Sequence, residues 1–206
     1  MSANYDKTSS FYDTLSRLVF GNTLRNAQIS LLTYIPADAV VLIAGGGTGW
    51  ILEEIAKVHS QGLEIFYVEI SANMLALSQK RSIGNNTVHF INSPAEMVSL
   101  PKPADVIITP FLFDNFTQQA AERLFNHLNG QLKPGGVWLN TDFQIAGKWW
   151  HKPLLKSMYL FFKLFNAVQV NQLPAISGLF EKNNYQVLKS KEFFGRFILS
   201  KARKNG

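Results

Sequence analysis

Short apolar runs alternate with amphipathic, helix-like segments along most of the chain, and this alternation constrains the fold more than any other feature. Runs rich in β-branched residues lie at 39–44, 63–69, 87–92, 104–109 and 137–143. Strands that alternate with helices are joined by crossovers and form a parallel sheet covered by helices on both faces. The sequence therefore predicts an α/β fold with a doubly wound, mostly parallel sheet.

The segments between and after these runs carry their own helix and turn signals. Helices are expected at 50–58, from an N-cap at Ser71 to about residue 80, and at 118–128. "KPGG" (133–136) is expected to be a turn before the fifth strand, and 174–183 to be a helix. The two segments on either side of Gly195 predict a final antiparallel hairpin, which brings the sheet to seven strands.

Composition narrows the class of protein. The chain has 206 residues, 47% of them hydrophobic and 17% charged, which fits one globular domain. It contains no cysteine, which excludes disulfides and thiolate chemistry. No apolar run approaches the roughly 20 residues needed to span a bilayer, and the first ten residues show no secretory signal. A cytoplasmic protein is expected.

Charge is unevenly distributed. Residues 1–144 hold 9 Lys and Arg against 12 Asp and Glu, whereas residues 145–206 hold 11 against 2. A basic C-terminal third is typical of contact with an acidic partner, a membrane surface or nucleic acid. A solvated basic face is the simpler interpretation.

A glycine-rich loop follows the first apolar run. Gly45, Gly47 and Gly49 have G-x-G-x-G spacing, whereas the dinucleotide fingerprint G-x-G-x-x-G needs a glycine where Trp50 stands. A phosphate-binding P-loop is excluded too, because no Lys-Ser/Thr pair follows the glycines. Glu69 ends the second run and is placed to accept hydrogen bonds from the hydroxyls of a ribose. An adenosine-containing ligand is therefore expected at this edge of the sheet.

Three stretches together resemble the class I, S-adenosylmethionine-dependent methyltransferases. "VVLIAGGGTG" (40–49) resembles the first motif of that family, "VEISANML" (68–75) the second, and "LKPGGVWL" (132–139) the turn before its fifth strand. The resemblance covers about 37–143 and implies a Rossmann-like methyltransferase fold with S-adenosylmethionine as cofactor. It divides a single domain into an N-terminal helical cap (1–36), a cofactor-binding core (37–143), a lid-like insertion (144–172), and a terminal helix and hairpin (173–206).

The resemblance also implies which residues contact the cofactor. The glycine loop would wrap the methionine part, the acid at the end of the second strand would hold the ribose, and the residues after it would cover the adenine. The residues concerned are Gly45, Gly46, Gly47, Thr48, Gly49, Glu69, Ile70, Met74, Ser93, Ala95 and Thr109. Two positions depart from the family: Ile43 and Pro94 stand where an acid is usual, and Asn92 or Ser93 could substitute for the second.

Methyl transfer from a sulfonium is an in-line displacement that depends mainly on positioning, so it needs no catalytic triad. "TPFLFDNF" (109–116) would face the transferred methyl, with Phe111 against the substrate. The motif N/D-P-P-[FY] is absent, which disfavours methylation of nucleobase or glutamine amide nitrogens. His151 is a weak candidate for a base. Asp142 and Asp114 either contact substrate or cap loops, and no metal site is expected.

The insertion is the most individual part of the chain. It places Lys152, Lys156 and Lys163 near one helical face, and Trp149 in the same segment is expected to contact the substrate. It resembles the segment that covers a hydrophobic substrate in ubiquinone- and menaquinone-type methyltransferases, and we favour such a lid over a plain packing helix or an interfacial membrane helix. Tyr5 and Tyr12 (in the N-terminal segment) would close the pocket.

The sequence thus predicts methylation of a small, apolar or aromatic molecule. Nucleic acid is not expected as a partner, and membrane association is possible but not favoured. The oligomeric state is left open. The alternative is a non-catalytic module of the same fold that binds a partner or membrane through its basic C-terminal third. A nicotinamide oxidoreductase is the third hypothesis, and Trp50 argues against it.

Overall fold

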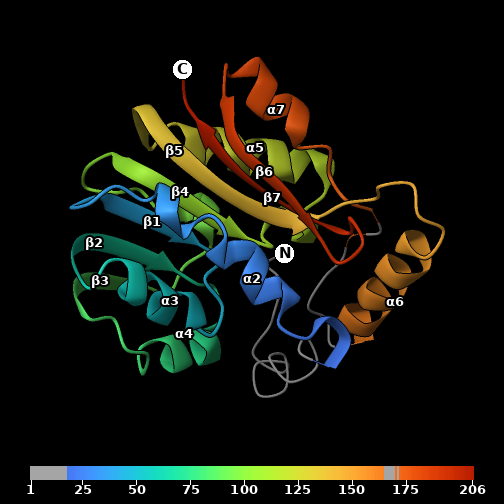
Figure 1. Ribbon diagram of the computed structural model, residues 1–206, viewed down its shortest axis with the longest axis horizontal. Helices are drawn as coiled ribbons and strands as arrows, with labels where there is room; N and C mark the ends of the chain where they lie inside the picture. Colours follow the sequence, from blue (N-terminus) through green and yellow to red (C-terminus); the bar gives the residue numbers. More distant parts are fainter. Residues whose placement is uncertain (1–17, 165–169, 171) are drawn as a thin grey trace.

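The computed structural model describes residues 18–164, 170 and 172–206 (Figure 1). The strands are β1 (Val40–Ala44), β2 (Gln61–Val68), β3 (Asn85–Ile91), β4 (Ala104–Pro110), β5 (Leu132–Phe143), β6 (Gln186–Phe193) and β7 (Ile198–Lys204). The helices are α2 (Thr23–Ile29), α3 (Trp50–Val58), α4 (Ala72–Ser78), α5 (Gln118–Asn129), α6 (His151–Leu164) and α7 (Ser177–Lys182). Short 3-10 turns are η1 (Leu32–Tyr34), η2 (Ala95–Met97) and η3 (Phe113–Asn115).

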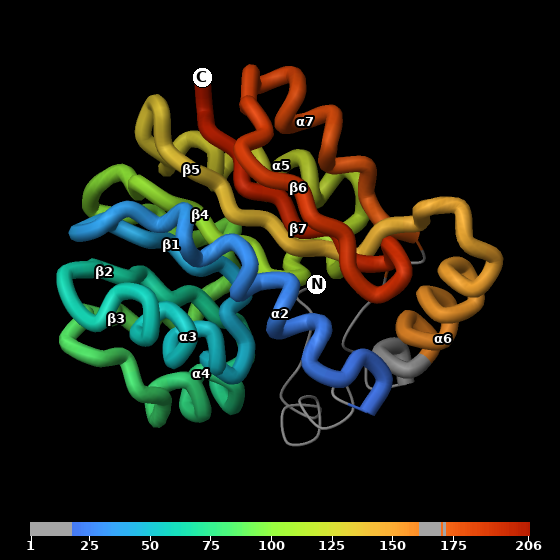
Figure 2. The backbone as a smooth tube through the Cα atoms, viewed as in Figure 1, coloured from blue at the N-terminus to red at the C-terminus, as the bar shows by residue number. Residues whose placement is uncertain are grey.

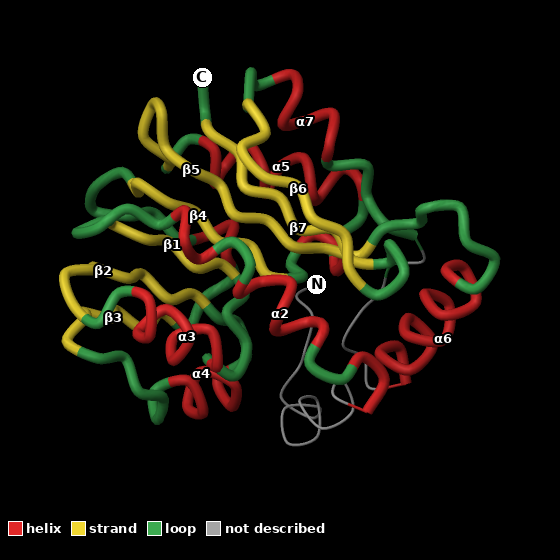
Figure 3. The backbone as a smooth tube through the Cα atoms, in the orientation of Figure 1, coloured by secondary structure: helices red, strands yellow, loops and turns green. Residues whose placement is uncertain are grey.

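The strands form one sheet in the order β3-β2-β1-β4-β5-β7-β6 (Figure 3). Strands β1 to β5 pair in parallel, and β7 pairs antiparallel with both β5 and β6. The chain runs outward from β1 to β3 and then returns to β4, so the order switches between β1 and β4. The predicted fold class is therefore confirmed, and the switch point is where such sheets bind their ligands.

Helices cover both faces of the sheet, as Figure 2 shows. On one face, α2, α3 and α4 pack on an apolar layer that includes Val41, Ile43 and Leu139. On the other face, α5 and α7 pack on a layer in which Trp138 stacks on Phe125 with ring centroids 5.0 Å apart. Strand β1 is buried at all five positions, which explains why its sequence is a continuous apolar run.

Two local predictions need correction. "KPGG" lies inside β5, because the register with β4 shifts from Ala104–Leu132 to Val106–Val137 and the extra residues form a bulge rather than a turn. The last helix is shorter than expected and begins at Ser177. The hairpin is as predicted. Its outer strand β6 is almost wholly exposed and carries Lys189 and Lys191, a common means of protecting a sheet edge.

The insertion forms α6, which lies beyond the carboxyl ends of β4 and β5 at the right of Figure 1. Leu155 and Tyr159 on α6 belong to a third apolar cluster with Phe20 and Phe197. The helix thus packs at this edge of the sheet, and its action as a lid stays a prediction. The division into four parts stays a prediction, and Tyr5 and Tyr12 lie outside the described residues.

Candidate functional site

The glycine loop leaves β1 and turns sharply over the end of β2. The backbone N–H groups of Gly45 and Gly46 donate to Val68 O at 2.9 and 3.2 Å. Gly45, Gly47 and Gly49 have φ of 73°, 65° and 80°, values that favour glycine. The spacing G-x-G-x-G is therefore the sequence signature of three left-handed residues in one tight turn.

The space around each glycine shows what the loop lies against. A Cβ on Gly46 would fall within 3.0 Å of two ring carbons and the hydroxyl oxygen of Tyr67, and one on Gly49 would meet Ser78 on α4. A Cβ on Gly47 would meet nothing within 4 Å. Two of these glycines thus let the chain pack on itself, whereas Gly47 faces open space that an external group can fill.

Glu69 is 5% exposed and links the loop to the next helix. Its Oε2 accepts from Gly47 N at 2.8 Å, and its Oε1 accepts from Ser71 N at 2.8 Å. Both carboxylate oxygens thus take part in holding the glycine loop against the start of α4. Asn92 supports this corner by donating from Nδ2 to Glu69 O at 2.9 Å and to Ile70 O at 3.0 Å.

The position of Ile43 explains why it carries no charge. Ile43 is fully buried in the apolar layer under α3, beside Tyr67 on β2. The Tyr67 hydroxyl donates to Gly47 O at 2.9 Å, so a neutral side chain holds the loop. Sequence reasoning missed Tyr67, because nothing in "LEIFYVE" distinguishes it from an ordinary core aromatic.

The residues expected around an adenine lie on the neighbouring elements. Ser71 caps α4, its Oγ accepting from Met74 N at 3.2 Å, and Met74 is 4% exposed. Ala95 is buried at the start of η2, after Pro94. Ser93 is half-buried. Asn92 is occupied by the corner at Glu69, so it stabilises the site from behind rather than replacing the missing acid.

At the end of β4, Thr109 does not have the position expected of a residue that contacts the cofactor. The Thr109 hydroxyl accepts from Trp138 Nε1 at 3.0 Å and from Asn140 Nδ2 at 3.3 Å, and Thr109 is fully buried. Its side chain is therefore part of a buried polar ladder rather than a free contact for a cofactor. Phe111 has a φ of 49° and packs on Phe143 with ring centroids 4.8 Å apart.

An acidic cluster continues this ladder to the edge of the sheet. Asn140 Nδ2 donates to Asp142 Oδ2 at 2.7 Å, and burial raises the pKa of Asp142 to about 7. Burial and the Asp142 charge together raise the pKa of Asp114 well above its usual range. Tyr159 of α6 donates from its hydroxyl to Asp114 O at 3.2 Å, and burial raises its pKa. Arg203, buried on β7, lowers the pKa of Asp142.

His151 and Trp149 do not have the expected surroundings. His151 is fully buried, its Nδ1 accepts from Ala146 N at 3.0 Å, and its Nε2 lies 3.2 Å from Gly195 O. Both ring nitrogens thus tie the insertion to the β6–β7 turn, which is a structural role rather than that of a base. Trp149 is 86% exposed and lies on the surface instead of in a pocket.

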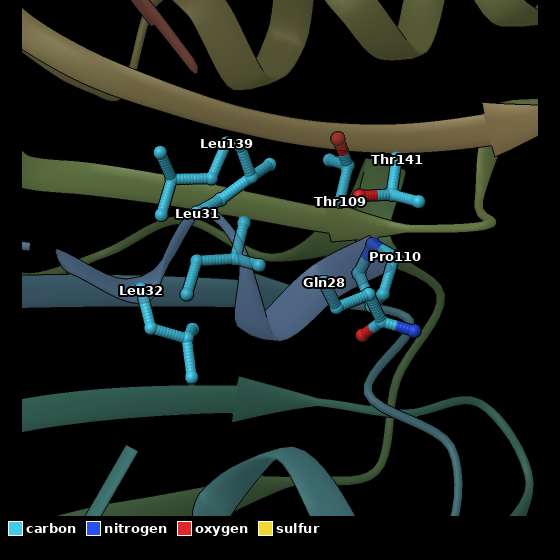
Figure 4. Close-up of a pocket in the computed structure, with 8 residues that line it drawn as sticks. Gln28, Leu31, Leu32, Thr109, Pro110, Leu139 and Thr141 are labelled. Carbon is cyan, nitrogen blue, oxygen red and sulfur yellow. The ribbon is translucent and has the colours of Figure 1, made fainter. Parts of the chain in front are cut away.

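A small cavity lies on the α2 face, where Gln28 lies beside Pro110 at the end of β4 (Figure 4). Its volume of about 10 Å³ is room for one water molecule, so it is a packing gap. No group of three or more His, Asp or Glu side chains in the described part of the chain could hold a metal ion. Within the same residues, no helix is long and apolar enough to cross a membrane.

Comparisons with known proteins agree with this geometry. The family model described as "methyltransferase domain" matches residues 41–136. No curated protein sequence matches the chain. Among solved structures, the 1,6-didemethyltoxoflavin-N1-methyltransferase of Burkholderia thailandensis, bound to its substrate and S-adenosylhomocysteine, superposes with a TM-score of 0.69 at 16% identity, covering 97% of this chain and 85% of that one.

Two further structures are similar. The magnesium protoporphyrin IX methyltransferase of Synechocystis has a TM-score of 0.65 at 15% identity, with 89% of this chain and 82% of that chain covered. A SAM-dependent methyltransferase from Aquifex aeolicus has a TM-score of 0.64 at 15% identity and covers 98% of both chains. The resemblance inferred from the motifs is confirmed, and its ubiquinone/menaquinone-type subgroup stays a prediction. Residues 41–136 therefore match a methyltransferase domain, and the chain has the fold of the class I, S-adenosylmethionine-dependent methyltransferases.

Proposed function

We propose that this protein transfers a methyl group from S-adenosylmethionine to a small, apolar or aromatic acceptor by in-line displacement. The observation that carries the proposal is the junction of Gly47 and Glu69, where an open backbone position meets a buried carboxylate at the switch point of the sheet. The structures with bound S-adenosylhomocysteine from Burkholderia and Synechocystis support this cofactor. The substrates named for those enzymes, 1,6-didemethyltoxoflavin and magnesium protoporphyrin IX, support a small ring-containing acceptor.

The residues of the loop fit the cofactor. The open space beside the Cα of Gly47 would admit the methionine part, Glu69 would accept from the ribose hydroxyls, and Met74 would lie against the adenine. The cofactor supplies an activated methyl group, and the protein contributes the alignment of acceptor and methyl, which lowers the barrier mainly by proximity. The aromatic side chains Phe111 and Phe143 at the end of β4 and β5 would hold the apolar body of the acceptor.

Calorimetry with S-adenosylhomocysteine tests the proposal, with two variants of the same strand compared. Glu69→Gln removes the charge at the switch point, and we expect at least about a tenfold loss of affinity, because hydrogen bonds to a charged group are the strong ones. Glu64→Gln, at a partly exposed position of β2, is the control and should bind like the wild type.

If the wild type binds neither S-adenosylmethionine nor S-adenosylhomocysteine at high micromolar concentration, the proposal is refuted. Binding of liposomes or nucleic acid instead, weakened by salt, would then favour the non-catalytic module. Nucleic acid is not the expected partner, membrane association is not favoured, and a cytoplasmic location stays a prediction of the sequence.

A further inference from the structure

Two carboxylates meet at the carboxyl edge of the sheet, where the loop after β4 crosses the end of β5. The Asp142 carboxylate lies against the backbone N–H groups of Phe113 and Asp114, which lower its pKa while burial raises it more strongly. Phe111 N donates to Thr141 O at 2.7 Å, so the backbone of this loop is pinned to β5. The two side chains are therefore held together by the fold.

The same loop lies beside the glycine loop. A Cβ on Gly45 would come within 2.9 Å of the Leu112 side chain, two residues before Asp114. The loop that carries Asp114 thus lies beside the glycine loop, where the methionine part of the cofactor is proposed to bind.

Each carboxylate has one oxygen fixed by a neighbouring amide. Asn140 Nδ2 donates to Asp142 Oδ2 at 2.7 Å, and Asn115 Nδ2 donates to Asp114 Oδ1 at 2.9 Å. Asp142 is 8% exposed, and its Oδ1 is buried without a hydrogen-bond partner among the described residues. A buried carboxylate oxygen that accepts no hydrogen bond is costly, so this atom can accept a bond from a further donor.

The charges around the pair point in the same direction. Tyr159 and Arg203 are the other titratable groups that face it from α6 and β7, and Arg203 is the cation among the causes that act on Asp142. The Arg203 guanidinium lies 3.9 Å from the centroid of the Phe180 ring, and burial lowers its pKa to about 10. Among the described residues Arg203 is the cation that acts on Asp142, and no cation is among the causes that act on Asp114, so the pair has fewer positive charges than carboxylates.

The neighbourhood of the pair is aromatic. Phe111 packs on Phe143, and Tyr159 bonds to the backbone of Asp114. Such surfaces take up apolar groups and the faces of their rings attract cations. The complementary ligand has an apolar or aromatic body and a positively charged, hydrogen-bond-donating end.

We propose that Asp114 and Asp142 together bind the amino group of an apolar or aromatic amine, the acceptor in the proposed methyl transfer, and receive its proton. This inference rests on the proposed function and specifies its substrate class. Asp114, which is half-buried, contacts the amine, and the buried Asp142 shares the proton with it.

Deprotonation of the amine precedes the methyl transfer. An ammonium group has no lone pair, so one N–H proton first passes to the carboxylate pair, and the nitrogen keeps the bonding electrons. This lone pair forms the new N–CH₃ bond while the C–S bond breaks and its electrons stay on sulfur, which becomes a neutral thioether. The product is a methylammonium ion, and the proton on the pair leaves to solvent.

Binding of matched amines and alcohols tests this inference on the complex with S-adenosylhomocysteine. The probes are 2-phenylethylamine, tryptamine and octylamine, each compared with the alcohol of the same skeleton. We expect at least one amine to bind about tenfold more tightly than its alcohol, and Asp142→Asn or Asp114→Asn to abolish this preference. Glu122→Gln, which removes a carboxylate from α5, should keep it.

Proton release gives a second readout at pH 6. Calorimetry in buffers of different ionisation enthalpy measures how many protons are released when the amine binds. The wild type should release about one proton, and the Asp142→Asn variant far less. Loss of S-adenosylhomocysteine binding in the wild type would refute the proposed function. Intact binding with no amine preference, or with a preference that both Asn variants keep, would overturn the inference alone.

Discussion

The contact between Gly46 and Tyr67 makes the most direct prediction about stability. Gly46 has ordinary backbone angles, so an alanine there is opposed only by space. Its Cβ would fall on the Tyr67 ring, which is fully buried and held by the bond from its hydroxyl to Gly47 O at 2.9 Å. Neither the Tyr67 ring nor the glycine loop can move away from the added methyl group without losing packing contacts.

The magnitude follows from these contacts. Overpacking a well-filled core costs about 1–3 kcal/mol, and loss of the Tyr67 hydrogen bond adds about 1 kcal/mol. We therefore expect Gly46→Ala to lower the free energy of unfolding by about 2–4 kcal/mol. Gly130→Ala is the matched control, because its φ is −67° and its Cβ would meet ordinary contacts at 3.6 Å. That change should be neutral or slightly stabilising.

Urea unfolding followed by tryptophan fluorescence measures both variants, and a double-mutant cycle identifies the cause. Tyr67→Leu alone should cost roughly 2–4 kcal/mol, because it leaves a cavity. In the double variant with Gly46→Ala the overpacking is absent, so the two losses should fall short of additivity by about 1 kcal/mol or more. Additive losses within about 0.5 kcal/mol would refute the assignment of the glycine to this contact.

Three further predictions concern the insertion and the acidic cluster. His151→Ala removes the ring that ties Ala146 to Gly195 and should lower the free energy of unfolding by roughly 2–4 kcal/mol in urea, while an unchanged midpoint would contradict the structural role. Trp149→Ala, at an 86% exposed side chain, should stay within about 0.5 kcal/mol of the wild type in the same assay. Burial raises the pKa of Asp142 to about 7 in the folded state, so the contribution of this group to stability is fully present below its unfolded pKa of about 4 and is lost as the pH rises from there through 7. Asp142→Asn should remove most of that fall, and a fall of equal size in the variant would refute the assignment.

Local sequence signals were sufficient for most of the fold. The predicted bounds of α3 match the structure, and Ser71 caps α4 as expected, because helix periodicity and N-cap chemistry act within a few residues. The bulge at "KPGG" depends instead on how β5 registers against β4, and that register is a property of two distant segments. A Pro-Gly-Gly sequence is compatible with either a turn or a bulge, so the strand partner decides.

The candidate site likewise contains residues that local sequence signals predict and residues that only long-range contacts determine. The sequence placed Glu69 at the end of β2 and the glycines after β1, because strand ends of a parallel sheet meet at one edge. It could not identify Arg203 as a buried partner of Asp142, since "SKARK" is typical of a solvated strand. Burial of Arg203 follows from its register opposite Trp138 and its stacking on Phe180, and both contacts are long-range.

The position of β7 has a consequence for the order of folding. β7 lies between β5 and β6, so the edge of β5 is covered only when the chain downstream of Gly195 has joined the sheet. Until then β5 is an open edge, with its hydrogen-bonding groups available to a strand of another molecule. A chain cut before Ile198 should therefore self-associate through β5, although every residue of the glycine loop and of β1 to β4 is present.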